Sequence, residues 1–227
     1  MGIKERQERD REAVRRSILD AARELFVSEG FQNVSIRKIA ERIEYSPAAI
    51  YGYFAGKDDI FFALAEEGFR LLCNGSRGEA RQKMTPVEQA RSRFERLYEF
   101  SREHPQYFAL MFLERSVPRI SKAYERFAFA REMRRQILSE LQACISAGDL
   151  PSTLEPTVAM RMLTVGLLGI AVLRLSDRLA PGEDADHLAA DMLDVVFAGL
   201  KSGVVLRSQA IADCPLDEES SVEKQAS

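Results

Sequence analysis

The sequence is poor in the residues on which metal and redox centres depend. It has two histidines, three cysteines and no tryptophan in 227 residues. His104 precedes a proline and His187 stands in a polar helix start, and neither has neighbours at metal-ligand spacing. Cys73, Cys144 and Cys214 form no CxxC pair and define neither a disulfide framework nor a zinc site. We expect reduced thiols, structural histidines, and no metal or cofactor.

Recognisable catalytic motifs are lacking as well. The sequence has no GxSxG elbow, no Walker loop, no GxGxxG fingerprint and no HExxH helix. Adjacent acids such as Glu66 and Glu67 point about 100° apart on a helix, so they would not face one substrate. We therefore expect a protein that is not an enzyme.

The sequence has neither a large excess of charge of one sign nor an apolar run long enough to cross a membrane. The formal net charge is −3, so a basic surface for nucleic acid would have to be local. The longest strongly apolar uncharged run, Met162 to Leu173, is shorter than the roughly 20 residues of a membrane helix. The charged N-terminus lacks the apolar core of a signal peptide. These features predict a cytoplasmic protein with no membrane partner.

What the sequence does contain is a pair of short amphipathic helices around a tight corner. Ser35 is a candidate N-cap for the first helix, and Ser46 for the second, with Pro47 at its first position, where a missing N–H costs nothing. Along the second helix, expected from Ser46 to Phe54, the outward residues are small or aromatic, which suits contact with bases and phosphates. This is the pattern of a helix-turn-helix, whose second helix enters the major groove.

The segment from about Arg15 to Leu71 resembles the N-terminal domain of the tetracycline-repressor (TetR) family. The matching elements are an entry helix from Ile18 to Phe31, a helix from Val34 to Ala40, and the run from Ser46 to Phe61. The most specific part is the Ile-Tyr-x-Tyr-Phe-x-x-Lys pattern that ends at Lys57, where the next helix begins with an N-terminus suited to a phosphate.

The resemblance implies a homodimeric transcriptional regulator. Such a protein, typically a repressor, binds a palindromic double-stranded DNA operator and is released by a small-molecule effector. Arg37 and Tyr51 would contact bases or phosphates, and Ser35, Tyr53 and Lys57 would hold the DNA backbone. The full set of expected DNA-binding positions is Ser35, Arg37, Pro47, Ala48, Tyr51, Gly52, Tyr53 and Lys57.

One position departs from the family pattern. Glu44 stands at a turn where similar proteins usually have glycine, and where the backbone needs a positive φ that costs a non-glycine residue about 1 kcal/mol. Residues 1–60 also carry 11 Lys plus Arg against 11 Asp plus Glu. These two features leave an alternative open: a helical ligand-binding or protein-interaction module with little specific DNA binding.

The N-terminal arm alternates basic with acidic residues. It admits two interpretations, an exposed helix with i,i+4 ion pairs or an arm that reaches into a DNA groove. The basic residues are Lys4, Arg6, Arg9, Arg11, Arg15 and Arg16, and the acidic ones are Glu5, Glu8, Asp10 and Glu12.

The remainder reads as helices separated by proline and glycine breaks, which predicts an all-α protein of about nine helices. The later helices are expected at Pro86 to Glu103, Pro105 to Arg115, Ser121 to Ala147, Thr157 to Leu175, and Ala185 to about Val205. The predicted units are a helix-turn-helix domain (1–71), a helical regulatory and dimerisation domain (72–213), and a flexible acidic tail (214–227).

The last two long helices are more apolar than a monomer of this size needs. They form either a buried central pair or, as the resemblance implies, a four-helix dimer interface. The residues expected at the dimer seam are Leu168, Val172, Met192 and Val196.

The middle helices are rich in aromatic residues and methionine. These residues either build the core or, as the resemblance implies, surround a cavity for a hydrophobic or aromatic effector. The candidate ligand-binding residues are Phe94, Tyr98, Tyr107, Met111, Phe112, Tyr124 and Phe127.

Overall fold

The computed structural model describes residues 2–74, 83–114 and 128–208, and within these ranges every regular element of secondary structure is a helix. The all-α fold class is confirmed. The described helices are α1 (Ile3–Glu29), α2 (Ile36–Arg42), α3 (Pro47–Tyr51), α4 (Lys57–Asn74), α5 (Pro86–Glu103), α6 (Pro105–Phe108), α7 (Ala128–Ser146), α8 (Pro156–Leu175) and α9 (Ala185–Lys201). A 3₁₀ turn spans Phe31–Asn33 and a π-helical turn spans Ala109–Leu113.

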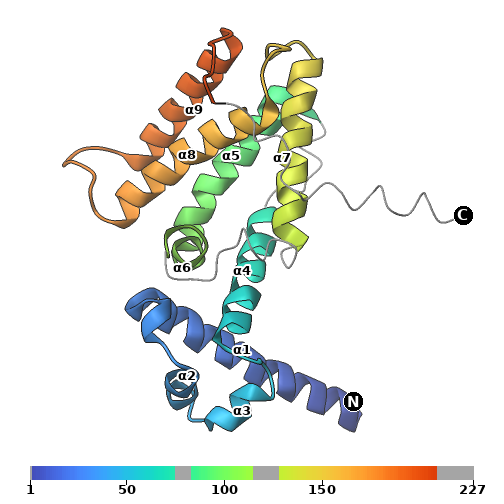
Figure 1. The fold of residues 1–227 in the computed structure, drawn as a ribbon, viewed down its shortest axis with the longest axis vertical. Coiled ribbons are helices and arrows are strands. Elements are labelled where there is room, and N and C mark those ends of the chain that lie inside the picture. The colour runs from blue at the N-terminus through green and yellow to red at the C-terminus, as the bar shows by residue number, and fades with distance from the viewer. Residues whose placement is uncertain (1, 75–82, 115–127, 209–227) are drawn as a thin grey trace, which may run out of the picture.

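Helices α1, α2 and α3 and the start of α4 form the N-terminal domain, at the lower end of the molecule in Figure 1. Their apolar faces meet in one core, which includes Phe26, Ile39, Ile50 and Phe61. Helix α4 rises from this domain toward α5 and α7. The boundary predicted between residues 71 and 72 therefore lies within a continuous helix, three residues before its end.

Helices α5, α7, α8 and α9 form a second core (Figure 1), in which Phe94, Leu141, Leu163 and Leu193 are buried. Helix α8 is long and apolar enough to cross a membrane by composition alone. Here it packs against α5, α7 and α9. Part of its apolar surface is thus covered by neighbouring helices.

Some helix boundaries agree with the sequence and others do not. The predicted span of α5 is confirmed at both ends, because Thr85 and Glu88 form a capping box and Pro105 follows the last turn. The entry helix expected to run to Phe31 ends slightly earlier, at Glu29, with Gly30 as its C-cap. However, α1 begins at Ile3 rather than Ile18, so the arm is a helical continuation. Residues 115–127, the start of the helix expected from Ser121, and the tail from residue 214 lie outside the described residues.

The cysteines and histidines that are described have structural surroundings. Cys73 and Cys144 are buried free thiols, and burial raises the pKa of Cys144 to about 11. His104 lies against the rings of Phe100 and Tyr107, with ring centroids 5.4 and 6.3 Å apart. The Cys144 thiol is therefore protonated at neutral pH, His104 is a packing residue, and His187 is an exposed residue 3.6 Å from Asp184.

Candidate DNA-binding surface and ligand cavity

The two serines at the helix starts cap α2 and α3. The hydroxyl of Ser35 accepts a hydrogen bond from the backbone N–H of Lys38 at 3.2 Å, and that of Ser46 accepts one from Ala49, also at 3.2 Å. Both predicted N-caps are confirmed. Helix α3 ends earlier than expected, at Tyr51, because Tyr53 and Phe54 turn inward and Phe54 is buried.

Glu44 has a left-handed backbone, with φ of 60°. The positive φ predicted for this turn position is therefore confirmed, and an exposed glutamate occupies it. The turn keeps its geometry because Tyr45 donates its backbone N–H to the carbonyl of Ala40 at 2.9 Å. The left-handed conformation costs about 1 kcal/mol of local backbone energy at this non-glycine residue.

Glycine at this turn should stabilise the protein relative to alanine. We expect the free energy of unfolding of Glu44→Gly to exceed that of Glu44→Ala by about 1 kcal/mol, because both remove the carboxylate and only glycine relieves the left-handed strain. Chemical denaturation followed by circular dichroism measures the difference. Equal stabilities would show that this turn carries no strain.

Six of the eight expected DNA-binding residues are exposed on the surface of α2 and α3. Tyr51 is 57% exposed, which is high for a large aromatic side chain. The Arg37 guanidinium is also exposed, with its Nε 2.9 Å from Oε1 of Glu41. The other exposed members are Ser35, Pro47, Ala48 and Gly52.

The remaining two, Tyr53 and Lys57, are half-buried and engaged within the domain. The Nζ of Lys57 donates to the carbonyl oxygen of Phe31 at 2.8 Å and lies 4.3 Å from the centre of the Phe31 ring. The guanidinium of Arg11 lies 5.8 Å from the centre of the Tyr53 ring. Lys57 thus ties the start of α4 to the 3₁₀ turn after α1.

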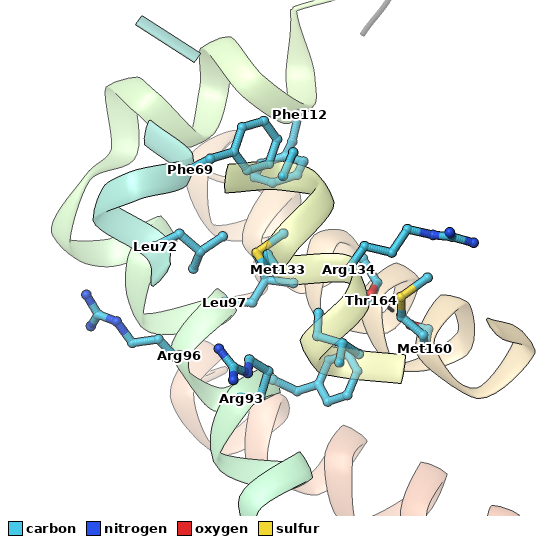
Figure 2. Close-up of a pocket in the computed structure, with 13 residues that line it drawn as sticks. Phe69, Leu72, Arg93, Arg96, Leu97, Phe112, Met133, Arg134, Met160 and Thr164 are labelled. Atoms are coloured by element: carbon cyan, nitrogen blue, oxygen red, sulfur yellow. Dashed lines mark hydrogen bonds between the residues drawn. The ribbon is translucent and has the colours of Figure 1, made fainter. Parts of the chain in front are cut away.

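A mainly apolar cavity of about 210 Å³ lies among α4, α5, α7 and α8. Figure 2 shows Phe69 and Phe112 at one end and Arg93 at the other, with Met133 between them. The lining residues are Phe69, Leu72, Arg93, Phe94, Arg96, Leu97, Phe112, Ala130, Met133, Arg134, Ile137, Met160 and Thr164.

Two of the expected ligand-binding residues, Phe94 and Phe112, line this cavity. Tyr98 points instead toward α9, where its hydroxyl donates to Asp186 at 2.8 Å, and burial together with this carboxylate raises its pKa to about 12. Met111 packs against Gly68 of α4, and Tyr107 faces α1. Tyr124 and Phe127 lie outside the described residues.

The sequence reasoning missed the arginines of the cavity. Arg93 is buried and forms a two-pronged pair with Glu140 of α7, at 2.6 and 3.2 Å. Arg96, one turn along α5, bonds to Glu103 at 2.8 Å and keeps a buried Nε without a hydrogen bond. Arg93 and Arg96 stand directly beside the apolar residues Phe94 and Leu97 of this amphipathic helix, which was a signal available in the sequence.

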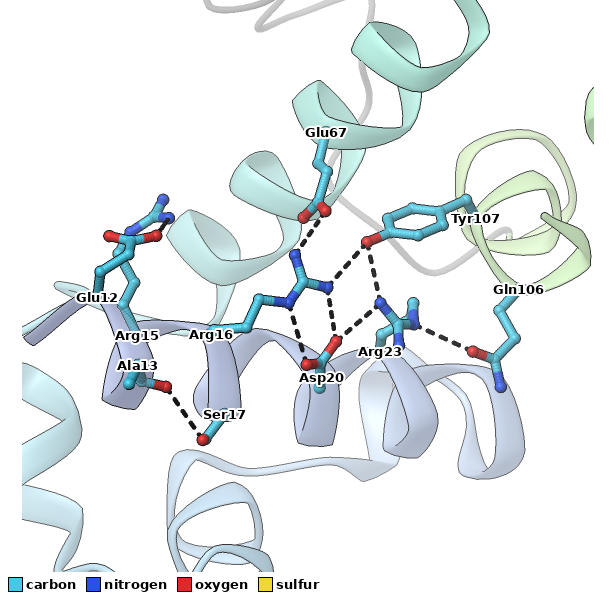
Figure 3. Close-up of polar contacts among 10 residues, drawn as sticks. All are labelled: Glu12, Ala13, Arg15, Arg16, Ser17, Asp20, Arg23, Glu67, Gln106 and Tyr107. Atoms are coloured by element: carbon cyan, nitrogen blue, oxygen red, sulfur yellow. Dashed lines mark hydrogen bonds and ion pairs between the residues drawn. The ribbon is translucent and has the colours of Figure 1, made fainter. Parts of the chain in front are cut away.

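A network of polar side chains joins the two domains (Figure 3). Arg16 of α1 bonds to Asp20 at 2.6 Å, to Glu67 of α4 at 2.5 Å and to the hydroxyl of Tyr107 of α6 at 3.3 Å. Arg23 donates to the same hydroxyl at 2.9 Å. The hydrogen bond from Arg16 holds the pKa of Asp20 below its usual value. The hydroxyl of Tyr107 therefore lies between two arginines of the DNA-binding domain.

Comparison with known protein families accounts for both parts of the chain. Residues 18–64 match the family model described as "Bacterial regulatory proteins, tetR family", and residues 91–196 match "Tetracyclin repressor-like, C-terminal domain". The chain belongs to the TetR family of transcriptional regulators. This membership supports the expectation of a regulator rather than an enzyme.

Similar proteins include both a transcriptional repressor and a transcriptional activator. The transcriptional repressor Rv1474c of Mycobacterium tuberculosis is 32% identical over 190 residues, covering 81% of this chain and 91% of the relative. The transcriptional activator FasR of Mycolicibacterium smegmatis is 27% identical over 166 residues, covering 71% and 70%. The structure of FadR from Bacillus subtilis in complex with stearoyl-CoA shares the fold, with a TM-score of 0.67 at 20% identity, over 81% and 97% of the two chains.

Helices α8 and α9 of this TetR-family protein together present an exposed apolar face. Its most exposed members are Val165 of α8 and Val195 of α9, at 61% and 71% exposed, and Met162, Leu173 and Leu188 continue it. The four residues expected at the dimer seam, Leu168, Val172, Met192 and Val196, are half-buried beside this face. Met192 packs tightly against Gly166, which brings α8 and α9 close together.

Proposed function

We propose that this TetR-family regulator is a cytoplasmic homodimeric repressor that binds a palindromic operator and leaves it when an apolar effector fills the cavity. The proposal rests on two features of the structure: α3 is capped and exposed, and polar contacts join its domain to the helical domain. That second domain contains a mainly apolar cavity. The repressor relative of 32% identity supports the sign of regulation.

The proposed operator contacts follow from exposure. Tyr51 and Arg37 reach bases or phosphates from α3 and α2, and Pro47, Ala48 and Gly52 allow the groove to approach α3 closely. Ser35 and Tyr53 support the phosphate contacts at the edges of this surface. At Lys57, the backbone N–H groups at the start of α4 provide an anion site, while the side chain holds that start in place.

The proposed dimer forms through the apolar face of α8 and α9. A two-fold axis there would place two α3 helices on half-sites about one helical turn, roughly 34–36 Å, or somewhat more apart. The exposed valines and leucines of this face suit burial against the same face of a second chain.

The proposed effector is a hydrophobic molecule with an anionic end. Apolar side chains form most of the cavity wall, and three of the lining residues are arginines: Arg93 and Arg96, which pair with Glu140 and Glu103, and Arg134. The similar FadR fold was determined with stearoyl-CoA. This supports testing acyl-CoA thioesters and free fatty acids first.

The proposed signal passes through α6 and the π-helical turn. Phe112 lines the cavity, and the turn that holds it follows directly on α6, where Tyr107 contacts Arg16 and Arg23 of α1. A π-helical turn is a rare element that is frequently found at functional sites. Displacement of Phe112 by a ligand would therefore move Tyr107 and alter the position of α1 under the operator-binding helices.

Removing the Tyr107 hydroxyl should weaken this coupling. We expect Tyr107→Phe to bind operator and effector, but to reduce the effector-induced change in operator affinity about tenfold, because two charged donors lose their shared acceptor. Operator titrations, with and without an acyl-CoA found by screening for release, measure the change. Tyr98→Phe is the matched control, since its hydroxyl bonds to Asp186 instead. Equal coupling in the wild type and Tyr107→Phe would contradict this route.

Selection of DNA from a random duplex pool by the full-length protein tests the proposed function. Enrichment of a palindrome is the expected result. No enrichment, even at low salt, would instead favour the alternative of a helical ligand-binding or protein-interaction module. Glu44 and the balanced charge of residues 1–60 are the features that favour that alternative.

A further inference from the structure

The first part of α1 is a helix that does not pack against the core. Helix α1 runs without interruption from Ile3 to Glu29, yet residues 4–13 are all exposed and its first buried side chain is Ile18. In Figure 1 the N-terminal end of α1 extends past the rest of the domain, near α3. Isolated helical turns of this length gain little from propensity alone. An external partner would give this extension a function.

The charges of the extension are balanced in number but separated in space. At 3.6 residues per turn, Lys4, Arg11 and Arg15 recur at i, i+7 and i+11 and share one face, with Gln7 between them. Glu8, four residues after Lys4, lies at the edge of this face, whereas Glu5 and Glu12 lie on the neighbouring side and Asp10 lies farther round the helix. Arg6 and Arg9 point to other sides of the same helix. One face of a nearly neutral segment is therefore cationic.

Two contacts show which way the cationic face points. The guanidinium carbon of Arg11 lies 5.8 Å from the centre of the Tyr53 ring, and that of Arg15 lies 5.4 Å from the centre of the Phe54 ring. Tyr53 and Phe54 directly follow α3, so the cationic face borders the operator-binding surface. A guanidinium stacked on an aromatic ring is held in place before a ligand arrives.

We propose that the cationic face of α1, formed by Lys4, Arg11 and Arg15, grips the DNA phosphate backbone that flanks each half-site. The inference rests on the proposed operator binding and adds a contact outside the helix-turn-helix. Eleven residues separate Lys4 from Arg15, which spans about 16 Å of helix. Each DNA strand presents a phosphate about every 3.4 Å along the axis, so several lie within this length.

The acidic neighbours do not cancel this face. Arg15 forms an ion pair with Glu12 at 3.5 Å, and the two side chains are 40% and 69% exposed. An exposed pair of this kind contributes little and is readily exchanged for another anion. Glu5 instead accepts a hydrogen bond from the backbone N–H of Gly2 at 2.8 Å, which caps the start of the helix. With Glu8 as the one acid at its edge, the face formed by Lys4, Arg11 and Arg15 keeps an excess of positive charge.

Salt dependence of DNA binding tests the proposal with a matched pair of variants. Lys4→Gln/Arg11→Gln removes two charges from the cationic face, and Arg6→Gln/Arg9→Gln removes two charges from other faces of the same helix. Affinity is measured as a function of salt for the full-length protein on the selected operator, with flanking DNA and trimmed to the half-sites. A random-sequence duplex is measured in parallel, because phosphate contacts do not depend on sequence.

On the operator with flanking DNA, Lys4→Gln/Arg11→Gln (the first variant) should flatten the slope of log affinity against log salt by about three to four for a dimer. Arg6→Gln/Arg9→Gln should flatten it by less than one. Trimming the flanks should flatten the wild-type slope by about five, because three cations of each chain lose their phosphates, and that of the first variant by only about two, because it retains Arg15 alone. Equal flattening by both variants, or an unchanged slope in the first, would overturn the proposal. If no operator is selected, the proposed function fails, and the random-sequence duplex still distinguishes the two variants.

Discussion

Replacing Val165 and Val195 together with aspartate should convert the protein to monomers and abolish operator binding at micromolar concentrations. The two valines are the most exposed apolar residues of α8 and α9. In a dimer each substitution would bury an unpaired carboxylate, which costs several kcal/mol. Light scattering should give the chain mass of 25.6 kDa, and a gel-shift titration should show no specific complex.

The same substitution at Val205 is the matched control. Val205 lies after the end of α9 and is 90% exposed, so Val205→Asp should leave both dimer and operator binding intact. Aspartate at Leu168 or Val196 is a less selective test, because both half-buried side chains also pack against the cores of a single chain. A dimer that survives the double substitution at micromolar concentration would contradict the proposed interface.

Shortening Tyr51 to alanine should weaken operator binding about 10- to 100-fold and change the preferred base near its contact, because a base-edge contact accounts for about 1–3 kcal/mol of discrimination. The free energy of unfolding should change by less than about 0.5 kcal/mol, since Tyr51 is largely exposed. Fluorescence anisotropy on operator variants, together with urea denaturation, measures both quantities.

Tyr45→Ala is the comparison for this experiment. Tyr45 is 44% exposed in the turn before α3, so it offers the same side chain outside the recognition helix. Its loss should not alter base preference. If Tyr51→Ala binds every operator variant as the wild type does, α3 does not read DNA through this residue.

The sequence predicted well the features that depend on near neighbours in the chain. Ser35 and Ser46 cap their helices, and Glu44 has a positive φ, because caps and turns are set by side chains and backbone within a few residues. The limits of α5 follow from a capping box at one end and a proline at the other. The TetR-family resemblance rested on the same short-range signals.

The cavity was harder to predict because its walls come from four helices. Phe94 and Phe112 reach it, whereas Tyr98 and Tyr107 bond to Asp186 and to the arginines of α1. Composition marks an aromatic side chain as buried, but only the packing of α5 against α7 and α9 determines which side it faces. The helical state of the N-terminal arm was likewise one of two open interpretations, and its charge pattern alone did not separate them.

The mass of the complex with selected DNA tests the central claim most directly. Sedimentation of the full-length protein on the intact palindrome should give two chains per duplex, and a duplex carrying a single half-site should bind far more weakly. Two chains on the palindrome would support a dimeric operator-binding regulator. One chain per palindrome, or equal affinity for the palindrome and the single half-site, would contradict it.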